Sequence, residues 1–155
     1  MDEFEKYLKI IKSDKALEDE ELIHAADKLI VNVADHPRLE KILIEAIYEL
    51  WENSIEVLKI RSIEIALKTL GTSFRSKNED YANMIFNFLI EKIPTASEKV
   101  KSTVIIHYSW AHHKFKESPE LVKIYDDLMT EWNKDKEFRL LFDEINHMGE
   151  VPSIH

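Results

Sequence analysis

The sequence of 155 residues contains no cysteine and no glutamine, and only two glycines and four prolines. The absence of cysteine excludes disulfides, thiolate metal sites and cysteine nucleophiles. The shortage of glycine and proline leaves few residues for the many turns of a β-rich fold, and therefore favours an all-α fold. No apolar run approaches the roughly 18 residues of a membrane span, and the acidic, amphipathic N-terminus is unlike a secretory signal. We therefore expect a cytoplasmic protein that does not span a membrane.

The net charge of −9 is distributed unevenly along the chain. Residues 1–58 carry −8, residues 59–116 carry +5, and residues 117–155 carry −6. A basic middle segment between acidic ends could bind an anionic partner or attract the acidic parts of its own chain. The overall negative sign disfavours a dedicated duplex-DNA binder, because such binding depends largely on the neutralisation of phosphates.

Apolar residues recur at helical spacing along nearly the whole chain. Thr95 with Glu98 has the form of a capping box at a helix start. Ser118 precedes Pro119, an order typical of a first helical turn. Together with the apolar periodicity, these signals predict eight helices, at residues 2–12, 18–34, 37–52, 55–71, 79–93, 97–116, 119–133 and 136–148.

A sequence pattern repeats about every 40 residues. KIRS at 59–62 is matched by KVKS at 99–102, and the apolar pattern of helix 37–52 recurs in helices 79–93 and 119–133. A two-helix unit of this length resembles a HEAT-type helical repeat over residues 18–133. The resemblance implies antiparallel helix pairs stacked into a compact array. We expect one all-α domain over 1–155, with an N-terminal helix in 1–17, helix pairs in 18–53, 54–94 and 95–133, and a C-terminal helix and tail in 134–155.

The distribution of apolar side chains predicts which helices lie inside the array. A helix that is apolar on two sides is expected to pack between neighbours, whereas one with a polar side is expected to face solvent. Helix 37–52 has two apolar stripes, Leu39, Leu43, Ala46, Leu50 and Ile44, Tyr48, Trp51, and helix 79–93 adds Phe86, Ile90 and Ile93 to its main stripe. The polar sides are Glu20, His24, Asp27 in helix 18–34 and Asp126, Asp127, Thr130, Glu131 in helix 119–133.

Residues 107–115 read HYSWAHHKF and contain three of the seven histidines. On a continuous helix 97–116, the core stripe would be Val100, Val104, Tyr108, Ala111 and Phe115. His107 and His112 would then flank this stripe on opposite sides, with His113 behind it. Two metal ligands on one helix should lie three or four residues apart on the same face, so we expect flanking and surface histidines rather than a metal site. A metal site would need ligands from other helices.

The face opposite that core stripe carries Ile106, Trp110 and His113, spaced four and three residues apart. If this face is exposed, it is a candidate surface for a protein partner, because exposed tryptophans often anchor interfaces. If it is internal, the helix predicted at 136–148 would cover it. The second interpretation is favoured, and both stay open at this point.

Two further sets of residues could carry chemistry. The spacing Glu-x-x-His occurs at Glu21–His24 and at Glu144–His147, as in di-iron bundles. Both histidines are predicted to lie opposite their helix's apolar stripe, which argues against such a site. The second set is basic: Arg61, Lys68, Arg75 and Lys77 follow the predicted exposed face of helix 55–71 and its exit. They could bind an anion or a nucleic acid, but a solvated face is favoured because no glycine-rich phosphate loop accompanies them.

The sequence contains no nucleophile elbow, phosphate loop or dinucleotide fingerprint. We therefore expect no catalytic residues, no cofactor and no resident metal. The leading hypothesis is a non-enzymatic module or scaffold that binds another protein, with a second copy of the chain as one candidate partner. The alternatives are a nucleic-acid-associated accessory protein that uses the basic middle segment, and a metal-dependent enzyme that uses the clustered histidines.

Overall fold

The computed structural model describes residues 2–72 and 79–134, and these residues form α-helices and short 3-10 turns without any strand. The prediction of an all-α fold is confirmed. The elements are α1 (Asp2–Lys12), α2 (Asp19–Asp35), η1 (Pro37–Leu39), α3 (Glu40–Glu52), α4 (Glu56–Thr72), α5 (Glu79–Lys92), η3 (Ile93–Thr95), α6 (Glu98–Ile106), η4 (Tyr108–Trp110), α7 (His112–Phe115) and α8 (Pro119–Lys134). The helix predicted at 136–148 lies outside the described residues.

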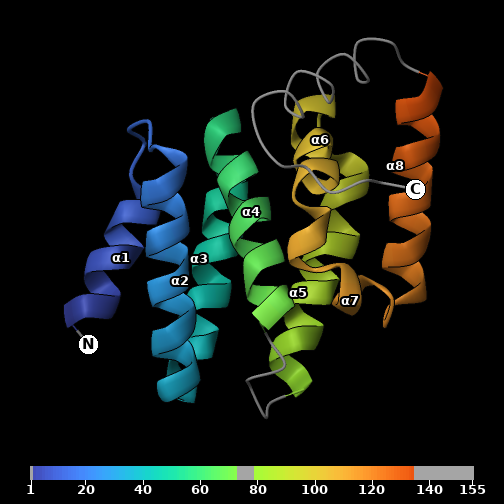
Figure 1. Cartoon of the computed structure of the whole chain (residues 1–155). Helices are drawn as coiled ribbons and strands as arrows, with labels where there is room; N and C mark the ends of the chain where they lie inside the picture. Colours follow the sequence, from blue (N-terminus) through green and yellow to red (C-terminus); the bar gives the residue numbers. More distant parts are fainter. Residues whose placement is uncertain (1, 73–78, 135–155) are drawn as a thin grey trace.

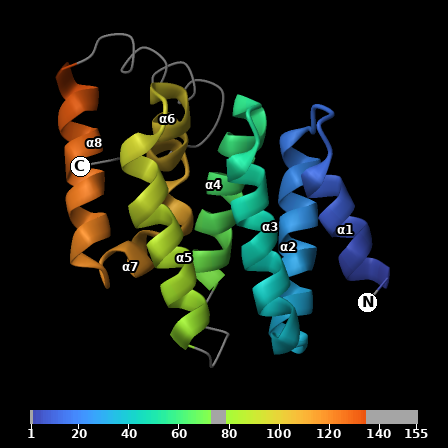
Figure 2. The same ribbon diagram turned by 180° about the vertical axis from the view of Figure 1, so that it is seen from behind.

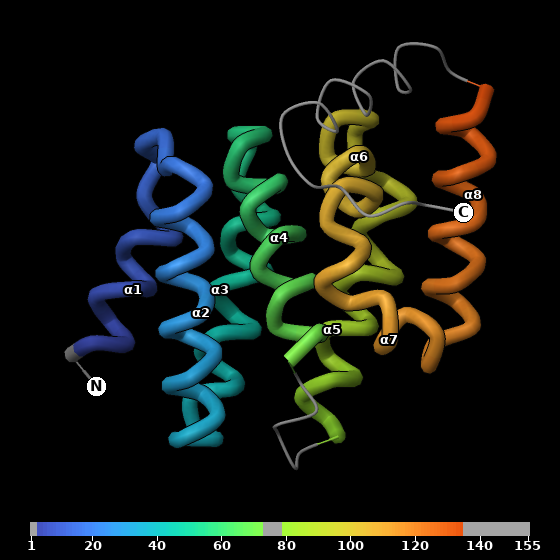
Figure 3. The backbone as a smooth tube through the Cα atoms, viewed as in Figure 1, coloured from blue at the N-terminus to red at the C-terminus, as the bar shows by residue number. Residues whose placement is uncertain are grey.

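The helices form two layers that face each other along the array (Figures 1 and 2). In one layer α2 packs on α4 and α4 packs on α6. In the other, α1 packs on α3, α3 on α5, and α5 on α8. Helix α8 also contacts α6, so that it ends the described part of the array against both layers. The tube in Figure 3 shows the chain advancing from α1 at one end to α8 at the other. Membership of the HEAT family stays a prediction.

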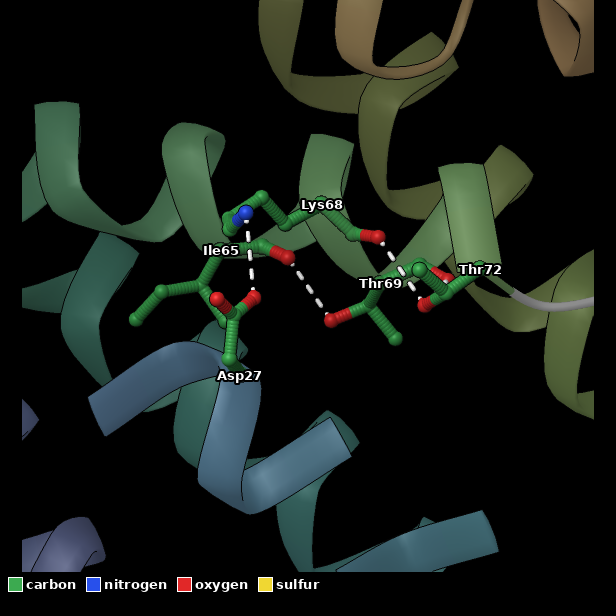
Figure 4. Close-up of polar contacts among 5 residues, drawn as sticks. All are labelled: Asp27, Ile65, Lys68, Thr69 and Thr72. Carbon is green, nitrogen blue, oxygen red and sulfur yellow. Dashed lines mark hydrogen bonds and ion pairs between the residues drawn. The ribbon is translucent and has the colours of Figure 1, made fainter. Parts of the chain in front are cut away.

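Helix α4 lies at the centre and contacts α2, α3, α5, α6 and α7. Its buried residues cover most of the helix circumference, except the side of Glu64 and Lys68, which are partly buried: Leu58, Arg61, Ser62, Ile63, Ile65, Ala66, Leu67, Thr69 and Leu70. The prediction of an exposed face on helix 55–71 is therefore wrong. A helix that is buried on most sides belongs in the interior, and here the interior also accepts Ser62 and Thr69, whose hydroxyls donate to carbonyls of the same helix. Thr69, for example, donates to the carbonyl of Ile65 at 2.7 Å (Figure 4).

The predicted faces of α2, α3, α5 and α8 are confirmed. The two stripes of α3 are buried, apart from the partly buried Tyr48, and in α5 Phe86 and Ile90 pack against the core. Ile93, which follows α5, is buried. The polar sides of α2 and α8 are exposed. The core therefore fills the space between the layers. Helices that are apolar on two sides lie in the middle, and helices that are apolar on one side lie outside.

The start of α8 is confirmed and the start of α6 is corrected. The backbone N–H of Leu121 donates to the hydroxyl of Ser118 at 3.3 Å, which caps α8. For α6 the cap is Ser97, whose hydroxyl accepts from the N–H of Val100 at 3.3 Å. Thr95 lies instead in η3 and donates to the carbonyl of Lys92. The predicted capping box fails because residues 93–95, with Pro94 in the first turn, form a 3-10 turn, so that the cap lies two residues later, at Ser97.

Candidate functional site

The segment predicted as one helix over 97–116 is broken in two places. Helix α6 ends at Ile106, η4 spans Tyr108–Trp110, and α7 is a single turn at His112–Phe115. The residues between these elements leave the helical region, with φ/ψ of −104°/15° at His107 and −135°/13° at Ala111. The prediction of a continuous helix is therefore wrong, but its predicted core stripe is confirmed: Val100, Val104, Ala111 and Phe115 are buried, and Tyr108 packs against the core.

Tertiary contacts explain the break. The backbone carbonyl of Trp110 packs directly on the Cα of Gly71 in α4, so close that a methyl group at Gly71 would collide with it. On the other side of the segment, the ring of Tyr108 stacks on Tyr125 of α8, with centroids 3.8 Å apart and planes 14° apart. The segment is thus held between α4 and α8, and its backbone follows these two contacts rather than a helical path.

Trp110 lies in a cluster of alternating charges and rings, which we call the Trp110 cluster: Asp27, Glu64, Lys68, His107 and Trp110. His107 stacks on the indole with centroids 3.9 Å apart, and its Nε2 is 3.3 Å from a Glu64 carboxylate oxygen. The Lys68 ammonium lies 5.0 Å from the indole centroid and 3.0 Å from the carboxylate of Asp27 (Figure 4). The cluster links α2, α4 and η4.

The predicted stripe of Ile106, Trp110 and His113 does not form one face. Ile106 ends α6 and is partly buried, Trp110 packs against the core, and His113 is exposed in α7. His113 contacts His112 instead, with ring centroids 3.8 Å apart. Trp110 therefore contacts both the core and the Trp110 cluster. Partner binding by Ile106, Trp110 and His113 stays a prediction.

Among the predicted anion-binding residues, Arg61 is buried at 2 % exposure, which overturns its placement on an exposed face. Its guanidinium donates to the carbonyls of Ile11, Ser13 and Lys15 at 2.7, 2.6 and 3.2 Å. These carbonyls belong to the end of α1 and the following loop, where carbonyls have no N–H partner within the helix. Arg61 therefore caps the C-terminal end of α1, although it is 46 to 50 residues from its acceptors in the sequence. Burial lowers the pKa of its guanidinium from the ordinary value.

Other cations of the basic middle segment also contact their own chain. Lys68 pairs with Asp27, Lys92 lies 3.5 Å from Glu52 and 2.9 Å from Glu91, and Lys114 lies 3.3 Å from Glu117. Hydrogen bonds to Glu91 contribute most to the raised pKa of Lys92. Three cations of the basic middle, Lys68, Lys92 and Lys114, therefore pair with carboxylates of the acidic ends. Arg75 and Lys77 lie outside the described residues.

The histidines do not converge on a common centre in the described residues, where no three His, Asp or Glu side chains are placed to hold a metal ion. Of the two Glu-x-x-His spacings, His24 is exposed as predicted, and its ring meets the edge of Tyr7 at 5.6 Å. Glu144 and His147 lie outside the described residues. In 2–72 and 79–134, no helix is long and apolar enough to cross a membrane.

A groove opens between η3, α6 and α8, with a volume of about 220 Å³. Its floor is apolar, because Ile93 and Leu128 are buried there and Ile124 is partly buried. Lys101 of α6 lines one side, and Asp127 and Glu131 of α8 line another. We call this the α6–α8 groove. It was not predicted, although the two carboxylates were correctly placed on the outer face of α8.

A second groove of about 310 Å³ lies between the α3–α4 loop and the start of α6. Its polar groups are engaged with one another. Lys59 donates to the carbonyl of Trp51 at 2.6 Å and lies 4.8 Å from the indole centroid. Ser97 donates to the carboxylate of Glu56 at 2.8 Å. These bonds hold α3, α4 and α6 together, so this groove offers fewer open contacts than the α6–α8 groove.

Within residues 2–72 and 79–134, two tyrosine hydroxyls are buried without a hydrogen-bond partner, those of Tyr81 and Tyr125. Burial is the largest cause of the raised pKa of both phenols, and nearby Glu40 and Tyr108, respectively, raise them further. Neither hydroxyl lines the α6–α8 groove. They therefore affect the stability of the fold at high pH and take no part in the candidate site.

Comparison with family models, with curated proteins and with solved structures gives no match. Function is therefore inferred from the α6–α8 groove and from the charges around it.

Proposed function

We propose that this protein is a non-enzymatic module that binds another protein through the α6–α8 groove. The observation that carries the proposal is the combination of an apolar floor, formed by Ile93, Ile124 and Leu128, with charged side chains along the edges. Interfaces commonly consist of an apolar centre with a polar rim. A groove of about 220 Å³ is of a size to receive one or two large side chains of a partner, as the anchor residues of many interfaces require.

The position of the groove beside α8, the last helix of the described part of the array, supports this role. Helix α8 is covered on its inner side by α5 and α6, and its outer side is exposed and acidic. A partner that filled the groove would continue the packing of helix on helix by which the array itself is built. The nucleic-acid alternative receives less support, because five cations of the basic middle are engaged within the chain, namely Lys59, Arg61, Lys68, Lys92 and Lys114.

The test replaces a residue of the groove floor by a charged one. Ile124→Glu places a carboxylate on the apolar floor, whereas the control Val122→Glu adds the same charge on the exposed face of the same helix, where Val122 is 38 % exposed. Each protein is immobilised, and proteins retained from a lysate of the source organism are quantified by mass spectrometry. We expect a set of proteins that wild type and Val122→Glu retain and Ile124→Glu loses. Circular dichroism checks that all three are folded.

Three identical retention profiles would contradict the proposal. Two further measurements address the alternatives. Salt-dependent retention of the wild type on immobilised RNA or DNA would favour the nucleic-acid role, since phosphate contacts weaken steeply with salt. A melting temperature lowered by several degrees in EDTA would favour a metal-dependent enzyme. We expect neither effect.

A further inference from the structure

The charges along the α6–α8 groove are opposite in sign but do not pair across it. Lys101 lines the groove from α6, and Asp127 and Glu131 line it from α8. The described residues show no ion pair within 4 Å between the ammonium of Lys101 and either carboxylate. Elsewhere the structure pairs such charges, as in Lys68 with Asp27 at 3.0 Å. The groove therefore presents a negative wall and a positive wall, separated by an apolar floor.

The two carboxylates are four residues apart on α8, which places them one helical turn, about 6 Å, from each other along the same wall. A partner helix that packs beside α8 can present two cations with the same spacing. An irregular segment would have to hold two long side chains at that spacing at a larger cost in conformational entropy. The spacing thus favours a helical occupant.

We propose that the α6–α8 groove binds a helical segment of a partner protein that inserts one large apolar side chain between Ile124 and Leu128. The segment carries Lys or Arg one turn apart on the side that faces Asp127 and Glu131, and Asp or Glu on the side that faces Lys101. This inference rests on the proposed function and specifies the partner. Opposite charges on the two walls also fix the direction in which the segment lies, because the reversed orientation brings like charges together.

The experiment uses a library of 16-residue helical peptides displayed on phage. One central position varies among apolar residues, and the positions on its two flanks vary among Lys, Glu and Gln on an Ala-based framework. The library is selected against wild type, the double variant Asp127→Lys/Glu131→Lys, and the control Glu120→Lys/Asp126→Lys. The control makes the same change in net charge on α8, with two exposed residues that do not line the groove.

With wild type and with the control, we expect selected peptides to carry an apolar centre, Lys on one flank and Glu on the other. With Asp127→Lys/Glu131→Lys, the Lys flank should change to Glu. The best wild-type peptide should bind this variant about tenfold more weakly, since each reversal replaces an exposed attraction by a repulsion. Lys101→Glu should change the preference on the other flank.

The outcomes separate this inference from the proposed function. Apolar peptides that are selected without charge preference, and that Ile124→Glu no longer binds, would keep the groove as a binding site and overturn the charge rule. Equal selection by all variants, Ile124→Glu included, would overturn both. If sedimentation shows wild type to dimerise and Asp127→Lys/Glu131→Lys to remain monomeric, the occupant is a second copy, and the assignment to a different partner is wrong.

Discussion

Helices α4 and α6 lie side by side in one layer and share a four-residue motif in their first two turns, yet they differ in length and in surroundings. KIRS in α4 corresponds to KVKS in α6, and in both helices the serine donates to the carbonyl three residues earlier at 2.6 Å. Helix α4 then continues to Thr72, whereas α6 ends at Ile106. The conformations of the two helices are alike in the motif, where local hydrogen bonds determine them. They differ after it, where contacts with different neighbouring helices determine them.

The positions that follow the shared motif show the cause. After KIRS, α4 continues with mainly small and aliphatic side chains, most of them buried, and contains no aromatic residue. After KVKS, α6 is followed by histidine, tyrosine and tryptophan, whose rings contact different partners: His107 meets Trp110, and Tyr108 meets Tyr125. These ring contacts and the close approach of Trp110 to Gly71 stabilise a backbone conformation that differs from an uninterrupted helix.

Within the motif, Arg61 and Lys101 occupy the same position and have opposite roles. Arg61 is buried and donates to three carbonyls at the end of α1. Lys101 is half-buried, lines the α6–α8 groove, and pairs with neither carboxylate of that groove. One cation stabilises the fold from within, and the other stays accessible to a partner. Each of the following predictions tests part of this comparison.

The largest effect is expected for Gly71→Ala. The added methyl carbon would lie within 2.9 Å of the Trp110 carbonyl carbon and closer still to its oxygen, so α4 and the broken segment must separate. We expect the free energy of unfolding to fall by about 3 kcal/mol, the upper range for overpacking, as measured by urea denaturation. The control Asn87→Ala, at an exposed position of α5, should be neutral or slightly stabilising because alanine is the better helix former. A stabilised Gly71→Ala would show that the close contact does not hold the break in place.

The second prediction compares Arg61→Lys with Lys101→Arg. Lysine lacks the planar fork that reaches three carbonyls at once, and an unsatisfied buried carbonyl costs about 1–3 kcal/mol. We therefore expect Arg61→Lys to lower the free energy of unfolding by about 2–3 kcal/mol. Hydrogen exchange should also accelerate in α1. Lys101→Arg, at the half-buried equivalent position, should stay within about 0.5 kcal/mol. Equal effects of the two substitutions would remove the distinction between the two cations.

Much of this fold follows from the sequence, because burial of apolar stripes is a local and periodic property. The ranges of α2, α3, α5 and α8 and the exposed or buried sides of these helices agree with the prediction. The break after Ile106 does not follow, because it is set by Gly71 and Tyr125, residues distant in the sequence. Arg61 was placed outside because charge usually means exposure, whereas its hydrogen bonds to α1 span about 50 positions. The α6–α8 groove depends on how α6 and α8 are placed relative to each other. The periodicity of apolar residues in the sequence does not determine this placement.

The third prediction concerns the Trp110 cluster, which joins α4 to the broken segment. Lys68→Met keeps the aliphatic stem over the indole and removes the charge that contacts both Trp110 and Asp27. We expect a loss of about 1 kcal/mol in the free energy of unfolding, composed of a cation–π contact and a partly exposed ion pair. Asp27→Asn removes only the ion pair and should cost about 0.5 kcal/mol or less, since the carboxylate is 54 % exposed. If both variants cost the same, the contact with Trp110 contributes nothing measurable.

The smallest effect at neutral pH is expected for Tyr125→Phe, which keeps the ring that stacks on Tyr108 and removes a hydroxyl without a hydrogen-bond partner. At pH 7 the free energy of unfolding should change by no more than about 0.5 kcal/mol.

Burial raises the pKa of the Tyr125 phenol above its ordinary value of 10.0. Below that pH both states keep the proton, whereas above it the unfolded chain ionises first, so the stability of the wild type falls as the pH rises. Tyr125→Phe should therefore lose less stability than wild type between pH 10 and 11 in urea titrations. Tyr81→Phe, which removes the other unpartnered hydroxyl, should behave in the same way if burial is the cause in both. A wild type and a Tyr125→Phe variant with parallel pH dependence would show that the hydroxyl beside the broken segment reaches solvent.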